Sequence, residues 1–227
     1  SAMRHEKLWR TLFYILMGLP LVVTLAALLV LPAEIPVHYN AAGEVNRWGS
    51  KYEMLLLPLI TLLMGAFLLK VSRWSEQKAP GNRTAVLAIG CGALLVFNVM
   101  TVAFLVKAYR IAALGTGLEL SVSRILFGVT GLLLFCLGNV MPKLRRNGWC
   151  GVRTDWTMEN DENWRRGQVA GGGVMMAAGL VLAVGNALLS SEEASLVFSM
   201  LCIVLMIPAL LIALALLRRK MEKERQG

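Results

Sequence analysis

Residues 32–53 carry side chains whose types and spacing suit the binding of a ligand. His38, Asn40 and Lys51 offer hydrogen-bond donors. Trp48 adds a large aromatic face, and aromatic residues often carry most of the binding energy of a recognition surface. Such a segment could hold a peptide or a lipid headgroup. The alternative is a self-packed loop that only closes a helix bundle.

The same segment contains signals for a compact structure. Pro36 predicts an extended start, because its ring fixes φ. Residues 40–43, which end in Gly43, predict a turn, and Trp48-Gly49 predicts a second turn before the next apolar run. We therefore expect a compact cap.

Enzyme chemistry would have to use this segment, because His38 is the only histidine that lies in a motif. A triad of His38, Tyr39 and a loop carboxylate is conceivable, and the candidate carboxylates are those of Glu34 and Glu44. The chain has two histidines and four dispersed cysteines, with no C-x-x-C. This pattern indicates neither a metal site nor a disulfide framework. We therefore predict no enzyme activity and no cofactor.

Residues 142–168 form the second polar segment that could do more than connect two helices. Thr157 is a candidate N-cap, because the acidic residues after it suit the positive end of a helix dipole, and we predict a helix that begins near Met158. Arg153 could form an ion pair with Asp155 or brace the loop. The segment is either a signalling surface that responds to a shift of the next span or a basic loop with a structural role.

Apolar blocks with almost no charge surround these two segments. The chain is 57% hydrophobic and 16% charged, whereas soluble domains are about 45–50% apolar and about 25% charged. Six blocks come close to the roughly 17–25 residues that a membrane-spanning helix needs. They fall at about 12–31, 54–69, 85–106, 125–141, 169–189 and 194–217. The predicted fold is an all-α, polytopic bundle of six transmembrane helices in the cell membrane.

The distribution of basic residues predicts the orientation of this bundle. Of the 23 Lys and Arg residues, 18 lie in the amino terminus, the second and fourth connections and the tail, and five lie in the other connections. By the positive-inside rule, both termini are predicted to be cytoplasmic and residues 32–53 to face outward. The net charge of +9 then reflects topology rather than nucleic-acid binding. The tryptophans expected at cytoplasmic span ends are Trp9, Trp74, Trp149, Trp156 and Trp164.

Polar residues inside the spans are few. Asn98, Asn139 and Asn186 are expected to form interhelical hydrogen bonds. No ionisable group is expected at membrane depth, which disfavours a small-molecule or ion transporter. The glycines expected to permit close helix contact are Gly167, Gly171, Gly172 and Gly173.

Two signatures resemble those of known families. Residues 35–51, which contain I-P-V-H-Y-N and W-G-S-K, resemble a widespread bacterial membrane domain of uncharacterised biochemistry. Residues 138–164, which contain G-N-V-M-P-K and G-V-R-T-D-W-T, resemble the SdpI immunity family. The first resemblance marks Pro36, His38, Asn40, Gly43, Trp48 and Lys51 as ligand-binding candidates. The second marks Asn139, Pro142, Gly151, Arg153, Trp156, Thr157, Asn160, Glu162 and Trp164 as inner-motif candidates.

The resemblance implies a non-enzymatic membrane protein. The best-studied members of the family are similar to a protein that protects its cell from a secreted peptide toxin and that also draws a transcriptional repressor to the membrane. A peptide toxin on the outer face and a cytosolic repressor on the inner face are therefore the implied partners. One departure is that Gln168 stands where family members commonly have histidine, so inner-face chemistry tied to that histidine is not expected.

Three regions follow from these observations. Residues 1–71 are a helical hairpin with the outer loop 32–53. Residues 72–124 hold a cytoplasmic loop, the third span and an outer loop. Residues 125–227 are the SdpI-type region, with the motif loop 142–168 and the last two spans.

The basic asymmetry yields a labelling prediction. In a variant without its native cysteines, Asn46→Cys should react with a membrane-impermeant maleimide added to intact cells. Asn147→Cys should react only after permeabilisation, because its loop is predicted to be cytoplasmic. The reverse pattern would show that the orientation is inverted.

Overall fold

The computed structural model describes residues 2–78, 83–117, 119–148 and 150–226. In chain order its elements are α1 (Ala2–Leu28), β1 (Glu34–Tyr39), β2 (Val45–Ser50), the 3₁₀ helix η1 (Lys51–Leu55), α2 (Leu56–Lys78), α3 (Arg83–Leu114), α4 (Val122–Val140), the 3₁₀ helix η2 (Met141–Lys143), α5 (Asp155–Glu159), α6 (Asp161–Leu188) and α7 (Glu192–Gln226). Six helices are long and apolar enough to cross a membrane, which confirms the predicted all-α bundle. An antiparallel hairpin of β1 and β2 is added to it.

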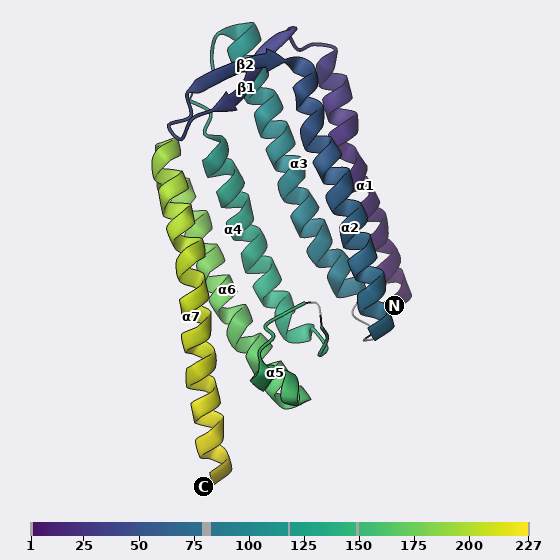
Figure 1. Cartoon of the computed structure of the whole chain (residues 1–227), viewed down its shortest axis with the longest axis vertical. Coiled ribbons are helices and arrows are strands. Elements are labelled where there is room, and N and C mark those ends of the chain that lie inside the picture. The colour runs from purple at the N-terminus through teal and green to yellow at the C-terminus, as the bar shows by residue number, and fades with distance from the viewer. Residues whose placement is uncertain (1, 79–82, 118, 149, 227) are drawn as a thin grey trace.

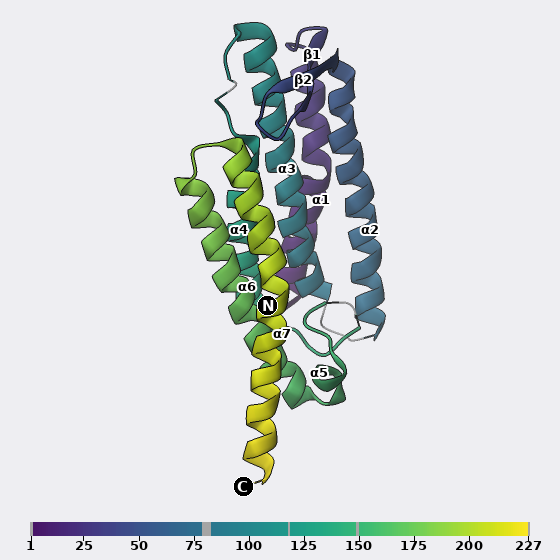
Figure 2. The same ribbon diagram turned by 60° about the vertical axis from the view of Figure 1, so that its left-hand side comes forward.

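The long helices run up and down the molecule and leave two polar ends (Figure 1). The hairpin lies at one end, together with residues 115–117, 119–121 and 189–191, and this end is called the hairpin end. The segment that contains α5 lies at the opposite end, called the motif-loop end. Figure 1 and Figure 2 show both chain termini on the side of the motif-loop end.

The bundle is built from two groups of three helices, α1–α3 and α4, α6 and α7. In the second group, α4 and α6 approach until their backbones touch at two glycine pairs. A Cβ atom on Gly131 would lie 2.6 Å from the carbonyl oxygen of Gly179, and one on Gly138 would lie 2.5 Å from that of Gly172. Gly172 therefore permits close contact as predicted. Gly173 has open space around it, so the prediction for that residue is wrong.

Buried amides link the helices at two of the three predicted positions. Asn98 of α3 donates through Nδ2 to the carbonyl oxygen of Leu16 in α1, at 2.8 Å. Asn186 of α6 donates to Ser199 of α7, at 3.0 Å. Both interhelical bonds confirm the prediction. Asn139 is exposed on α4, and its side chain bonds to none of the described residues, so the prediction is wrong there.

The third span extends further than the sequence predicts. The apolar run ends at Val106, but α3 continues to Leu114 and carries Lys107 inside the bundle. Lys107 is 1% exposed, so a cation beyond the predicted end of the span is buried in the protein. Its ammonium is stabilised near the hairpin by contacts that lie far away in sequence. One cation at one end of the bundle still does not make a path across it.

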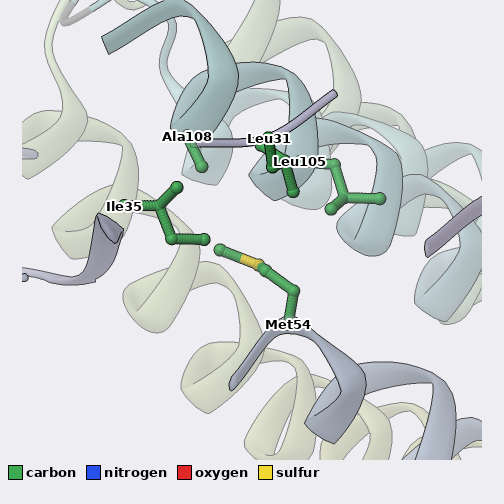
Figure 3. Close-up of a cluster of buried hydrophobic side chains, with 5 residues drawn as sticks. All are labelled: Leu31, Ile35, Met54, Leu105 and Ala108. Carbon is green, nitrogen blue, oxygen red and sulfur yellow. The ribbon is translucent and has the colours of Figure 1, made fainter. Parts of the chain in front are cut away.

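A cluster of apolar side chains fixes the hairpin to the bundle. Ile35 of β1 is fully buried and packs with Met54 of η1 and with Leu105 and Ala108 of α3. Figure 3 shows Ile35 and Met54 pointing toward each other beneath α3. Burial of a side chain of this size contributes about 1.5–3 kcal/mol. The predicted outer loop is therefore a docked, ordered element.

Two of the tryptophans expected at span ends are packed inside the protein. Trp156 lies against Leu214 and Met221 of α7, and Trp164 lies against the loop after η2. Both are buried, so their placement at a membrane interface is wrong. Trp149 lies outside the described residues.

The glycine contact yields a stability prediction with a matched control. Gly131→Ala should lower the stability of the protein by about 1–3 kcal/mol, because its methyl group would strike backbone atoms that cannot move independently. Gly128→Ala, one turn away on α4 with open space, should leave stability unchanged or raise it by up to ~1 kcal/mol through helix propensity. The measurement is thermal unfolding of both variants in detergent. Equal melting temperatures would show that α4 and α6 are less tightly packed.

Candidate functional site

The first candidate site is the β-hairpin. In its register Pro36 lies opposite Trp48, and His38 lies opposite Arg47, with an irregularity between the two pairs. Pro36 is buried in β1, which confirms the predicted extended start. Trp48 and Gly49 lie within β2, so the predicted second turn is wrong. Both residue types also occur in strands, and pairing with β1 decides the conformation.

The tip of the hairpin is stabilised by Asn40. Its Oδ1 accepts hydrogen bonds from the backbone N–H groups of Ala42 and Glu44, at 3.0 and 2.9 Å. Its Nδ2 donates to the Glu44 carboxylate at 2.8 Å. Gly43 adopts a φ of 82°, which favours glycine. The turn at residues 40–43 is confirmed, and the Asn40 side chain is engaged within it.

Lys51 joins the hairpin to the end of α1. Its ammonium donates to the carbonyl oxygens of Leu28 and Leu31, at 2.7 and 3.2 Å. These carbonyl groups lie at the C-terminus of α1 and just beyond it, where a cation also suits the helix dipole. Lys51 therefore caps a helix, and these two bonds use two of its three N–H donors.

His38 and Trp48 are the candidate binding residues that remain on the surface. Trp48 is 51% exposed. The Nδ1 atom of His38 lies 2.6 Å from Oδ1 of Asn46, which orients the ring. Beside them, Arg47 forms an exposed ion pair with Glu53 at 2.9 Å. This surface combines an aromatic face with polar groups on a rigid support.

The arrangement of these residues disfavours the alternative of a catalytic triad. His38 pairs with Asn46 rather than with a carboxylate, and Glu44 bonds to Asn40. The acid–histidine pair that a triad needs is therefore not formed by His38 and Glu44. Among the described residues, no cluster of three or more metal-ligating side chains occurs.

The second candidate site is the motif loop, residues 142–168. Thr154 is the N-cap of α5, and its hydroxyl accepts the N–H of Thr157 at 3.2 Å. A reciprocal hydrogen bond is formed by Thr157, whose hydroxyl accepts the N–H of Thr154 at 2.8 Å. The prediction of Thr157 as an N-cap is therefore wrong. The helical conformation is interrupted at Asn160, which caps α6. The predicted single helix that begins near Met158 is therefore replaced by the short helix α5 and the long helix α6.

Gln168 holds the middle of this loop. Its Oε1 accepts the N–H of Val152, and its Nε2 donates to the carbonyl oxygen of the same residue, both at 2.9 Å. Gln168 is fully buried. Gly151 has a φ of 98°, and a Cβ atom there would lie 2.4 Å from the amide oxygen of Gln168. The residue that departs from the family pattern therefore makes a two-point amide clamp, which sequence reasoning missed.

Further buried contacts tie the loop to the helices. Trp164 donates through its indole N–H to the carbonyl oxygen of Leu144 at 2.7 Å. Asn163, absent from the candidate residues, donates to the carbonyl oxygen of Trp156 at 3.0 Å. The sequence does contain a pattern that points to Asn163, because it lies three positions after the cap residue Asn160 and is polar. These side chains satisfy backbone groups of the loop itself.

The remaining inner-motif candidates are exposed or partly exposed. Arg153 donates to the carbonyl oxygen of Gly148, which favours the bracing role over the ion pair with Asp155. Glu162 pairs with Arg166 at 3.0 Å. Pro142 lies at the start of η2, where its missing N–H costs nothing. The two candidate sites lie at opposite ends of the bundle and do not meet (Figure 1).

Comparisons with known proteins match both signatures. Residues 143–217 match the model of the SdpI/YfhL protein family, and residues 15–62 match that of a domain of unknown function, DUF1648. The chain is 21% identical over 154 residues to the immunity protein SdpI of Bacillus subtilis (strain 168). That match covers 68% of this chain and 70% of the relative. No solved structure matches the chain.

The amide clamp yields a stability prediction. Gln168→Met should lower the free energy of unfolding by about 2 kcal/mol, because it leaves the N–H of Val152 without its partner and removes one of the two donors to the carbonyl oxygen of Val152, the other being the hydroxyl of Thr157. Arg165→Met, an exposed position on the same helix, is the matched control and should change stability by less than about 0.5 kcal/mol. Thermal unfolding in detergent measures both. Equal melting temperatures of the two variants would show that water replaces the hydrogen bonds of the amide clamp without a loss of stability.

Proposed function

We propose that this chain, a multi-pass membrane protein of the SdpI family, protects its bacterial cell against a membrane-active peptide toxin that it binds at the hairpin. The likeness to a protein named as an immunity protein supports the general role. The hairpin surface supports the particular mode of action. In this proposal the hairpin faces outward, as the distribution of basic residues predicts.

One observation carries the assignment of the binding surface. Trp48 is half exposed on a hairpin that is otherwise firmly docked and internally bonded. A rigid aromatic residue binds with little loss of conformational entropy, so it is suited to anchoring an apolar peptide. His38, held by Asn46, adds an oriented polar group beside it. Lys51 and Asn40 support this surface rather than form it.

Capture of a cytosolic repressor at the other end has weaker support. Thr157, Asn163, Trp164 and Gln168 are buried and bonded to the backbone of the motif loop. A soluble partner could reach them only if the loop unfolded. These contacts support a structural role for the inner motif.

Toxin challenge tests the proposed function. Deletion of the gene in its own bacterium should make the cells sensitive to peptide in the medium of the unmodified strain, and the intact gene should restore resistance. Trp48→Ala should restore it poorly, with a roughly 30-fold lower tolerated dose, because loss of an anchor costs about 2 kcal/mol of binding. His38→Ala should show a smaller loss in the same direction.

The matched control is Trp74→Ala, which removes a partly exposed tryptophan from the opposite end of the bundle. It should protect as well as the intact protein when present at equal membrane levels. Full protection by Trp48→Ala would show that the hairpin only caps the bundle. Resistance of the deletion strain would count against the immunity function as a whole.

A further inference from the structure

A cavity of about 340 Å³ lies beneath the hairpin, between β1, α3, α4 and α7. Tyr39 and Lys107 line it near the hairpin, and the apolar side chains of Phe104, Phe127 and Leu196 line it about one helical turn further from the hairpin end. The cavity therefore has one polar end and one apolar end. Its volume falls at the lower limit of small-ligand pockets, which span about 300–1,000 Å³.

The ammonium group of Lys107 is buried at the polar end with an incomplete set of partners. It lies 3.3 Å from the carbonyl oxygen of Gly43 and 4.6 Å from the centre of the Tyr39 ring. An ammonium group has three N–H donors, and these two contacts use two of them. Among the residues that the structure describes, no carboxylate forms an ion pair with Lys107. A buried charge in this state costs free energy unless a partner is supplied.

The nearest acidic side chain of the cavity is turned toward a different partner. Glu192 accepts the backbone N–H of Ser123 at 3.1 Å and the hydroxyl of Ser121, both at the N-terminus of α4. Its carboxylate therefore caps α4. Glu119, the other acidic residue whose charge acts on Lys107, is paired with Arg110 at 2.9 Å. Both carboxylates are thus engaged elsewhere.

A second donor at the same end is without a partner among the described residues. The hydroxyl of Tyr39 is buried and forms no hydrogen bond with the described residues. Burial raises the pKa of Tyr39 to about 12, so the hydroxyl keeps its proton at neutral pH and can donate. Buried polar groups without partners are rare, and each one calls for an explanation. Tyr39 and Lys107 together offer two donors to one acceptor in the cavity.

We propose that this cavity binds a single-chain anionic amphiphile. Its carboxylate or phosphate head accepts hydrogen bonds from Lys107 and Tyr39, and its hydrocarbon tail lies along Phe104, Phe127 and Leu196. The small volume favours one chain over a two-chain lipid. Trp48, the proposed toxin anchor, does not line this cavity, whereas its neighbour on the hairpin surface, His38, does.

Titration calorimetry of the full chain in dodecyl maltoside tests the proposal, with laurate as the carboxylate probe and dodecyl phosphate as the phosphate probe. The intact protein should bind one molecule of either probe with saturation, and the tighter one identifies the head group. Dodecanol, which has the same tail without charge, should bind at least tenfold more weakly. Lys107→Met should weaken binding of the anionic probes at least tenfold, and Tyr39→Phe about threefold, because each removes one donor to a charged group.

Arg110→Met is the matched control, because it removes a partly exposed cation from the same helix outside the cavity lining, and it should weaken probe binding far less than Lys107→Met does. Trp48→Ala should also bind the probes normally, which separates this site from toxin protection. Equal affinity of the intact protein and Lys107→Met for laurate and dodecyl phosphate would overturn the proposal. So would equal affinity of the intact protein for dodecanol and the anionic probes.

Discussion

The backbone groups that helix ends and turns leave unpaired must find partners, and this requirement shapes both ends of the bundle. At the hairpin end Lys51 satisfies the last carbonyl group of α1 and one just beyond it, and Asn40 satisfies two N–H groups of the turn. At the motif-loop end Gln168 pairs with both backbone groups of Val152, and Trp164 satisfies Leu144. Much of both sequence signatures is therefore explained by local hydrogen bonding rather than by ligand contact.

The same requirement connects the two groups of helices at the hairpin end. The hairpin is docked on α3 by Ile35, yet its tip reaches the N-terminus of α7, where Gly43 lies against Glu192. A Cβ atom at Gly43 would lie 3.2 Å from the Glu192 side chain. Glu192 in turn caps α4. The turn of the hairpin thus lies against a residue that begins α7 and caps α4 in the other group.

The sequence predicts the membrane-spanning helices well, because hydropathy depends on composition over many residues. It predicts the turn at Asn40–Gly43 for a similar reason, since that turn is stabilised by its own side chains. Local sequence patterns give wrong predictions where contacts between residues far apart in the sequence determine the conformation. In the sequence, Lys107 marks the end of an apolar run and predicts the end of the span. In the structure the helix continues past it, because the Tyr39 ring and the Gly43 carbonyl, more than sixty residues away, stabilise its buried ammonium group. Thr157 has the features of an N-cap, but Thr154 competes for that role and takes it.

Strand β1 places the two unexplained features of the hairpin end side by side. His38 is exposed and the next residue, Tyr39, carries a buried hydroxyl, and both residues line the cavity. Lys107, the other donor in that cavity, is also bonded to the hairpin tip at Gly43. A ligand that accepted the remaining donor of Lys107 would bind the same ammonium group that holds the hairpin tip. The cavity and the turn of the hairpin thus share one side chain.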